Sequence, residues 1–300
     1  MNNTPAEHIP VLTEFAAGIS LKDDAIVVDA TIGSGGHSKI FAKSLGKDAV
    51  LLGFDVDNNC LAIARQNLAA LPCKVLLVRE NFANIAQVLR QNGIEKVDLI
   101  FADLGVCSTQ LADENKGLSF EKDMKIDMRL DDRLTISAAD IVNRMDEKGL
   151  ADLIYNFAQE RASRKIARSI IQARQKKKID TTAEFVNIIC HALRCNPKSR
   201  KSRIHPATKT FQALRIAVNS ELENLEKFLA AVPNLLKKDG KIAVISFHSL
   251  EDRIVKMNFR QNKAAGIYEI ATKKPITASA AQRLENPRSR SAKLRIAVRL

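Results

Sequence analysis

Apolar and polar residues follow two patterns along the first third of the chain. Short runs rich in β-branched and other apolar residues alternate with segments long enough for a helix. Such runs are typical of strands buried on both faces of a parallel sheet, with helices connecting them. The predicted strands cover residues 25–29, 50–55, 74–78, 97–103 and 241–247, and alternating residues at 293–300 close the chain. The pattern predicts a doubly wound, mostly parallel α/β sheet.

The alternation of predicted strands and helices ends after Asp103. Between about residues 111 and 210 no run predicts a buried strand, and charged helical patterns such as 160–178 take their place. A long amphipathic segment at 211–236 then leads back to the strand at 241–247. We therefore expect an inserted helical domain at 111–210, within an α/β domain made of 1–110 and 211–300.

The chain is strongly basic. Of its 300 residues, 47 are Lys or Arg and 34 are Asp or Glu, which gives a formal net charge of +13. This excess indicates a polyanionic partner, either a nucleic acid or an anionic membrane surface, and a basic protein without such a partner is the alternative. Because the amino-terminal residues are polar and no run reaches roughly 20 apolar residues, we expect no membrane span and a cytoplasmic location.

The five cysteines show neither C-x-x-C spacing nor the density of a disulfide-rich scaffold. Cys190, His191 and Cys195 are conceivable metal ligands, but no second pair of ligands lies near them in the sequence. Cysteine more often serves as a small buried apolar residue. We therefore expect no metal.

A glycine-containing segment follows the first predicted strand. It reads D-A-T-I-G-S-G-G-H from Asp29 to His37 and leads into a predicted helix. In the dinucleotide fingerprint G-x-G-x-x-G the third glycine would fall at Ser38, which disfavours a nicotinamide cofactor. An acid before the glycines would repel a pyrophosphate, whereas it suits the ammonium group of S-adenosylmethionine. A tight turn with a helix-capping acid is the alternative interpretation.

Acids also end the second and fourth predicted strands. Asp55 follows the glycines by about 20 residues, where a carboxylate can accept hydrogen bonds from both ribose hydroxyls of an adenosine cofactor. Asp103 ends the fourth strand in V-D-L-I-F-A-D-L-G-V-C-S. If the first and fourth strands are adjacent, a crevice opens at their carboxyl ends, which predicts Asp103 at its rim. A strand-ending acid in an ordinary turn is the alternative.

Five segments resemble one protein family. They are D-A-T-I-G-S-G-G-H-S at 29–38, D-L-G-V-C-S-T-Q at 103–110, R-I-H-P-A-T-K-T-F-Q-A-L-R-I-A-V-N at 203–219, I-S-F-H-S-L-E-D-R at 245–253 and N-P-R-S-R-S-A-K-L-R at 286–295. They are similar to segments of the bacterial ribosomal RNA small subunit methyltransferase H family, and the resemblance extends over nearly the whole chain from H-I-P-V-L at residue 8. It implies a Rossmann-like, S-adenosylmethionine-dependent methyltransferase domain, interrupted by a helical substrate-binding domain.

The resemblance also implies a reaction and a set of contacts. The reaction is methylation of the N4 amino group of a cytidine in the decoding region of 16S ribosomal RNA, within the small ribosomal subunit. With Gly33 of the same loop, the expected cofactor contacts are Gly35, Gly36, His37, Asp55, Phe82, Asp103 and Gln110. The ring of Phe82 suits the adenine face. The backbone N–H of His37 suits the carboxylate of the donor, which leaves its imidazole without a role.

Asp103 is the candidate catalytic residue. The cytosine amino nitrogen is a poor nucleophile, because its lone pair is delocalised into the ring, so the reaction needs an acceptor for its hydrogens. Asp103 is expected to position the amine or to accept from it, directly or through water. Asp127 and His248 are weaker candidates for residues of the same pocket.

The chain departs from the family pattern at few positions. Leu118 replaces a usual phenylalanine, and Lys125 and Ile126 stand where proline and leucine are expected, changes that bear on a substrate loop. Cys107 stands in place of serine, and a thiol near a crevice acid raises the alternative of a cytosine-C5 methyltransferase, which attacks the ring with a thiolate. A non-catalytic RNA-binding or ribosome-assembly factor with the same fold is the second alternative.

Basic residues mark the expected RNA surface, with a merely solvated charged face as the alternative. They follow a helical spacing in the insertion, then a basic loop and a segment near the carboxyl terminus. The candidates are Arg161, Arg164, Lys165, Arg168, Lys198, Arg200, Lys201, Arg203, Arg288 and Arg290. A cytidine must leave its stack to reach the crevice, so we expect a single-stranded or flipped nucleotide. A homodimer remains possible.

Overall fold

The chain forms two compact units. The computed structural model describes residues 10–197 and 205–300. The first unit runs to Cys107 and resumes at Leu222, and the second is Ser108–Glu221. The second unit starts slightly earlier than the expected 111–210. It also ends later, because helix α10 (Thr208–Asn219) packs on α7 (Glu147–Ala158) of this unit.

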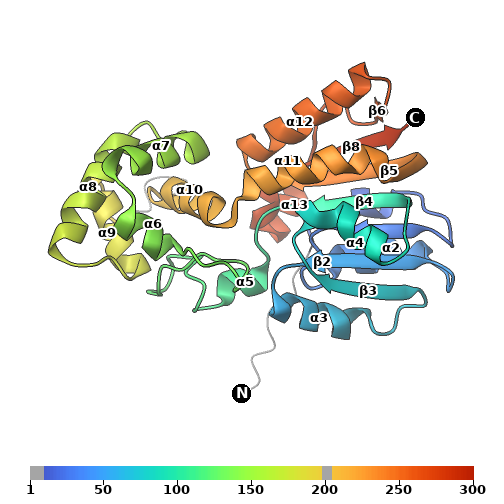
Figure 1. Ribbon diagram of the computed structural model, residues 1–300, viewed down its shortest axis with the longest axis horizontal. Coiled ribbons are helices and arrows are strands. Elements are labelled where there is room, and N and C mark those ends of the chain that lie inside the picture. Colours follow the sequence, from blue (N-terminus) through green and yellow to red (C-terminus); the bar gives the residue numbers. More distant parts are fainter. Residues whose placement is uncertain (1–9, 198–204) are drawn as a thin grey trace. The chain divides into compact units, whose positions relative to one another are not determined.

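A mixed sheet forms the centre of the first unit (Figure 1). Its strand order is β3-β2-β1-β4-β5-β8-β6, with β7 paired to β8; β1 to β5 are parallel, and β8 is antiparallel to β5. The strands are β1 (Ile26–Asp29), β2 (Val50–Asp55), β3 (Lys74–Arg79), β4 (Val97–Asp103), β5 (Leu236–Ser246), β6 (Tyr268–Ile270), β7 (Ile276–Thr277) and β8 (Lys293–Arg299). The six predicted strands are all present, and the doubly wound α/β prediction is confirmed.

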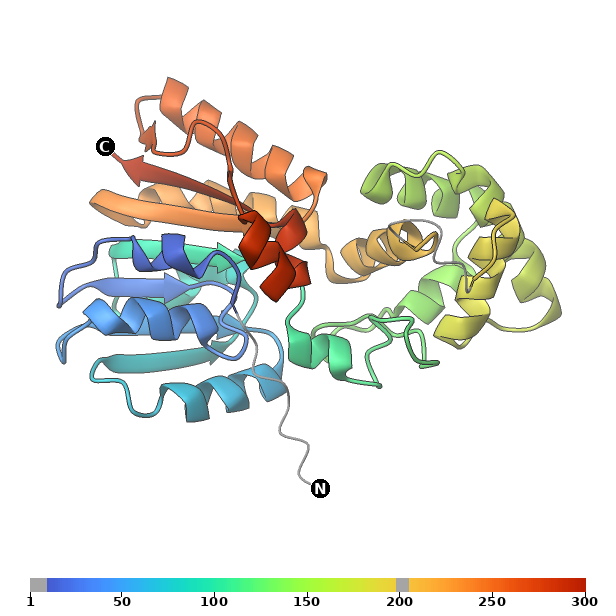
Figure 2. The same cartoon turned by 180° about the vertical axis from the view of Figure 1, so that it is seen from behind.

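Helices cover both faces of this sheet (Figures 1 and 2). Successive residues of a strand point to opposite faces, so Val27 belongs to one hydrophobic cluster and Val28 to the other. The first cluster includes residues of α1 (Thr13–Ala17), α2 (Gly36–Phe41) and α3 (Asn58–Leu68), and the second includes residues of α4 (Ile85–Gln91), α11 (Glu221–Ala231) and α12 (Ser249–Ala264). Because the strands are buried on both faces of the sheet, their sequences are nearly continuous apolar runs.

The second unit has its own hydrophobic core. Its helices are α5 (Ser108–Ala112), α6 (Ala138–Arg144), α7, α8 (Ser163–Lys176), α9 (Thr182–Leu193) and α10. Phe185 of α9 and Phe211 of α10 meet in the core, with ring centroids 5.5 Å apart. Among the described residues of this unit, the only β pairing is an isolated bridge between Lys125 and Thr181.

The amphipathic segment at 211–236 is not one element. Ser220 adopts a left-handed conformation with φ 49° and ends α10, and α11 begins at Glu221. Two short strands, β6 and β7, were also not predicted, since two or three residues carry too little alternation to be distinguished from a loop. Within the described ranges 10–197 and 205–300, no helix has both the length and the apolar character that a bilayer crossing requires.

Candidate active site

Three acids mark the carboxyl edge of the sheet. Asp29, Asp55 and Asp103 are the last residues of β1, β2 and β4. Because β1 pairs in parallel with both β2 and β4, these three strand ends share one edge. The strand order reverses between β1 and β4, which is where open α/β sheets bind their ligands.

Asp29 anchors the glycine loop from inside. Its Oδ2 accepts a hydrogen bond of 2.7 Å from Ser38 Oγ, and its Oδ1 accepts one of 3.2 Å from the Thr31 N–H. The side chain is only 1% exposed, and burial raises the pKa of its carboxyl to about 6 despite these hydrogen bonds. Asp29 therefore stabilises the conformation of the loop, and a contact between Asp29 and a cationic ligand stays a prediction.

The loop needs glycine at two positions because of its backbone conformation. Gly33 has φ 51° and Gly35 has φ 85°, both in the left-handed region. A Cβ on Gly35 would also lie 3.1 Å from the Leu68 side chain, and one on Gly36 would lie 3.2 Å from Pro10. Glycine is therefore needed here for the conformation of the loop and for its close packing against Leu68 and Pro10.

Asp55 ties this loop to the end of β2. Its Oδ2 accepts a hydrogen bond of 3.1 Å from the Gly33 N–H, and its Oδ1 accepts one of 2.9 Å from the Asp57 N–H. Burial raises the pKa of the Asp55 carboxyl to about 7, with Cys107 and Asp57 as smaller contributors. Each carboxylate oxygen keeps a second lone pair, so Asp55 can still accept from ribose hydroxyls.

Asp103 carries a buried oxygen that has no hydrogen-bond partner. Its N–H donates to Thr31 Oγ1 at 2.6 Å, which fixes the strand end, and the side chain is 16% exposed. Among the described residues, no group bonds to Asp103 Oδ1. Burial, followed by the nearby Asp29 and Glu251 carboxyls, raises the pKa of Asp103 well above its usual value. An orphaned buried acceptor is costly and is typical of a site that a ligand completes.

His37 lies directly beside Asp103. Its Nε2 is 2.8 Å from the Val11 carbonyl oxygen, and its Nδ1 is 3.5 Å from Asp103 Oδ2. A carbonyl oxygen only accepts, so His37 Nε2 carries a proton. The contact between His37 Nδ1 and Asp103 Oδ2 is favourable when one further proton lies between these two atoms. The ring also packs on Phe101 at 4.6 Å. These contacts fix the orientation of the imidazole beside Asp103, and whether it takes part in binding or reaction stays untested.

Phe82 begins a short 3-10 helix, η2 (Phe82–Asn84), after β3. It is half-buried, and its ring meets the edge of Phe228 at 5.3 Å. Gln110 is buried in α5 of the second unit. Their contacts with the cofactor stay predictions.

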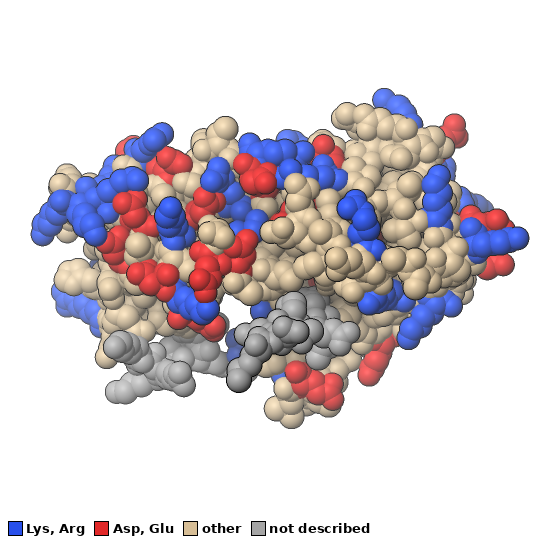
Figure 3. Space-filling view, turned by 90° about the horizontal axis from the view of Figure 1, so that it is seen from below, with Lys and Arg blue, Asp and Glu red and all other residues tan. Residues whose placement is uncertain are grey.

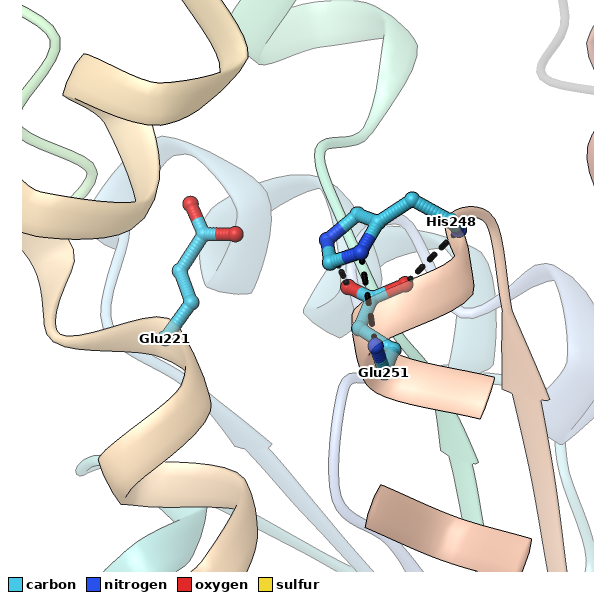
Figure 4. Close-up of side chains that lie close together, drawn as sticks. All are labelled: Glu221, His248 and Glu251. Atoms are coloured by element: carbon cyan, nitrogen blue, oxygen red, sulfur yellow. Dashed lines mark hydrogen bonds and ion pairs between the residues drawn. The ribbon is translucent and has the colours of Figure 1, made fainter. Parts of the chain in front are cut away.

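His248 and Glu251 form the capping box that starts α12 (Figure 4). His248 Nδ1 accepts from the Glu251 N–H at 3.3 Å, and Glu251 Oε2 accepts from the N–H groups of Phe247 and His248 at 2.8 and 3.2 Å. The imidazole Nε2 lies 3.2 Å from Glu251 Oε1. These contacts give His248 a structural role as a helix cap, and a role in the pocket stays a prediction.

Asp127 is paired within the second unit. Its Oδ1 accepts from Arg129 Nε at 2.8 Å and its Oδ2 from Arg129 Nη2 at 2.7 Å. Burial raises the pKa of the Asp127 carboxyl, but the bonds from Arg129 outweigh it and leave the pKa below its usual value. Asp127 is therefore a weak base that shapes its loop.

The basic candidates differ in what the structure describes. Arg161, Arg164, Lys165 and Arg168 are all exposed on or just before α8, and Arg168 lies 3.5 Å from Glu147. Arg288 and Arg290 are exposed in η4 (Pro287–Ser291). Lys198, Arg200, Lys201 and Arg203 fall outside the described residues. On the face shown in Figure 3, Lys and Arg side chains of the second unit are interspersed with Asp and Glu side chains.

Two polar residues of the site were missed by sequence reasoning. Thr31 accepts from the Asp103 N–H, and Ser38 donates to Asp29. Ser38 did give a signal, since it stands where the dinucleotide fingerprint has its third glycine. The Ser38 hydroxyl at this position supplies a hydrogen-bond donor to the buried carboxyl of Asp29.

Sequence comparison decides the family. The MraW methylase family model matches residues 5–300. The chain belongs to the MraW methylase family. As a member, it is a methyltransferase that uses S-adenosylmethionine as methyl donor, and the resemblance found in its five segments is confirmed.

Relatives of this MraW methylase cover almost its whole length. The ribosomal RNA small subunit methyltransferase H of Koribacter versatilis is 44% identical over an alignment of 300 positions, which covers 97% of this chain and 94% of the relative. The enzyme of the same name from Acaryochloris marina is also 44% identical, over 98% of this chain and 94% of the relative. That of Acidobacterium capsulatum is 42% identical, over 97% of both chains.

Proposed function

We propose that this MraW methylase transfers a methyl group from S-adenosylmethionine to N4 of a cytidine in the decoding region of 16S ribosomal RNA, within the small ribosomal subunit in the cytoplasm. The names of its relatives support small-subunit ribosomal RNA as the substrate. The observation that carries the reaction type is Asp103, whose buried Oδ1 lacks a partner at the point where the strand order reverses.

The residues at the carboxyl edge fit the donor. Asp55 suits the ribose hydroxyls, and the lack of side chains at Gly35 and Gly36 suits close approach of a ligand to the loop backbone. Phe82 offers an aromatic face for the adenine. When bound, S-adenosylmethionine supplies an electrophilic methyl group on a positively charged sulfonium.

Asp103 has the properties of an acceptor that becomes active when the site is filled. In the free protein burial raises the pKa of the Asp103 carboxyl well above its usual value. Positive charge in the crevice favours the carboxylate and lowers that pKa, so Asp103 can then accept from the N4 amino group. His37, at 3.5 Å, can share or receive the proton. The remaining requirement is alignment of the amine in a site that excludes water.

Incubation with labelled methyl donor tests this function. The full-length protein is supplied with either naked small-subunit ribosomal RNA or assembling subunits, and the modified nucleoside is identified by mass spectrometry against N4- and C5-methylcytidine standards. We expect N4-methylcytidine. A C5-methylated product would support the thiolate mechanism at Cys107 instead, and binding of RNA without any transfer of label would support an assembly factor.

A further inference from the structure

Two cysteine thiols meet beside the cofactor loop. Cys60 lies in the first turn of α3, and Cys107 follows β4 in the first unit. Their Sγ atoms are 3.2 Å apart. A disulfide bond is about 2.05 Å long, so a relative shift of about 1 Å would bring the sulfurs to bonding distance. We propose that Cys60 and Cys107 form a reversible disulfide that weakens binding at the cofactor site.

Both cysteines adjoin the residues that shape this site. The Cβ of Cys107 lies 3.7 Å from the place that a Cβ on Gly33 would occupy, so Cys107 backs directly on the glycine loop. Cys60 stands three residues after Asp57, which caps α3 and donates its N–H to Asp55. A bond between the two sulfurs therefore joins the segment after β2 to the segment after β4, across the loop that lies on the sheet edge.

The exposure of the two thiols fits a stepwise oxidation. Cys107 is partly exposed, and Cys60 is 1% exposed. A peroxide first oxidises the Cys107 thiol to a sulfenic acid: RSH + H₂O₂ gives RSOH + H₂O. The Cys60 thiol then attacks the sulfenic sulfur, and water leaves as the disulfide forms: RSOH + R′SH gives RSSR′ + H₂O. The peroxide is thereby reduced by two electrons, and a dithiol reductant reverses the process.

The structure indicates which side moves. Cys60 belongs to the packed helix α3, whereas Cys107 belongs to the loop between Asp103 and α5, where Gly105 has φ 104°. The two sulfur atoms therefore approach each other mainly through movement of this loop, which shifts away from its position beside Gly33. Because this argument rests on the proposed function of the site, the expected effect is a loss of S-adenosylmethionine affinity of at least about tenfold.

The chain contains internal controls. Cys190 and Cys195 also lie close together, with Cys195 Sγ 3.6 Å from the Cys190 carbonyl oxygen, but they belong to the second unit. A Cys190→Ser/Cys195→Ser double variant should keep the response to peroxide. Cys60→Ala and Cys107→Ser should bind the donor as the reduced wild type does and should not respond to peroxide.

The test combines peptide mapping with calorimetry on the full-length protein. After stoichiometric hydrogen peroxide, non-reducing mass spectrometry should show a linked Cys60–Cys107 peptide. The dissociation constant for S-adenosylmethionine should rise at least about tenfold and return after dithiothreitol. Absence of the linked peptide, an unchanged affinity of the linked protein, or an equal loss of affinity in Cys60→Ala would overturn the proposal.

A second readout separates this proposal from the proposed function. If the reduced wild-type protein binds no S-adenosylmethionine, the proposed function fails. Hydrogen exchange of residues 29–38 then tests the effect of the disulfide on the loop without any measurement of cofactor binding. Faster exchange of this segment in the linked protein than in the reduced protein supports the proposal, and equal rates contradict it.

Discussion

The acids that end β1, β2 and β4 share one position in their strands but differ in their hydrogen bonds. Asp29 and Asp55 each use both oxygens to hold nearby groups of the loop, whereas Asp103 has one buried oxygen without a partner. Burial is the main cause of the raised pKa at all three. Asp29 and Asp55 therefore stabilise the loop, and we propose that Asp55 also binds the cofactor and that Asp103 takes part in the reaction.

Asp55→Ala should weaken S-adenosylmethionine binding without unfolding the protein. The change removes an acceptor for the ribose hydroxyls, at a cost of about 1.5 to 3 kcal/mol, or roughly 10- to 150-fold in Kd. Calorimetry measures the affinity, and circular dichroism checks the fold. Asp48→Ala is the matched control, because Asp48 is an exposed acid near the other end of β2. An unchanged Kd in well-folded Asp55→Ala would remove Asp55 from the cofactor site.

Asp103→Asn and Cys107→Ser should have opposite effects on methyl transfer. The asparagine keeps the shape but cannot become an anionic acceptor, so we expect single-turnover rates to fall by at least about 10²-fold. An N4 reaction has no covalent intermediate on sulfur, so Cys107→Ser should retain most activity. Full activity in Asp103→Asn would contradict its role, and loss of transfer in Cys107→Ser would contradict the N4 route.

At the scale of elements, the buried strands were predictable, whereas the shorter features were not. β-branched residues buried on both faces leave a strong signal, which gave β1 to β4 to within a residue or two. Ser220 breaks the 211–236 segment without changing its amphipathic pattern, because each helix on either side buries its own apolar face. Local pattern alone does not encode such a break.

The same distinction holds for the candidate site. Asp55 and Asp103 were predictable because a strand end fixes where a side chain lies. The contact of His37 with Val11 joins positions 26 residues apart, and the approach of Cys60 to Cys107 joins positions 47 apart. Such pairs depend on tertiary packing, which neither spacing nor propensity reports.

Helix α8 allows a test of RNA binding at this scale. Replacement of Arg161, Arg164, Lys165 and Arg168 together by Gln should weaken RNA binding and flatten its salt dependence, since fewer counterions are released. Affinity for S-adenosylmethionine should stay constant.

A second variant, in which four exposed lysines are replaced, controls for the loss of net positive charge. Lys22, Lys43, Lys47 and Lys96 precede β1, β2 and β4, at the edge of the sheet opposite the site. Replacing them by Gln removes the same charge. If both variants lose RNA affinity equally, α8 is only part of a general basic surface.

At the scale of the whole molecule, the raised acids link folding to pH. Asp29 and Asp55 have pKa values of about 6 and about 7 in the folded protein, against 3.8 when unperturbed, and burial raises the pKa of Asp103 well above its usual value. The folded state therefore keeps protons that the unfolded chain has already released. Their stabilising contribution is full below pH 3.8 and is lost as pH rises through the folded pKa values.

The free protein should accordingly lose stability between about pH 4 and 7 through these groups. Asp103→Asn removes one of them, so its melting temperature should exceed that of the wild type at pH 8, and the difference should vanish toward pH 4. Calorimetry of both proteins without ligand measures this, and the comparison cancels the general effect of net charge. A variant less stable than the wild type at pH 8 would contradict a pKa of Asp103 that burial raises in the folded protein.

The sheet topology also has a consequence for the order of folding. β4 and β5 are neighbours in the sheet, but the whole second unit, 108–221, lies between them in the chain. Closing a flexible loop costs conformational entropy that grows with its length, and a folded insertion shortens the effective loop. We expect the second unit to acquire its core early, so that pulse-labelled amides of α7 and α10 are protected before those of β5. β5 pairs with β4 alongside Asp103, so we expect a nascent chain to complete the sheet at Asp103 only after the second unit has formed its core.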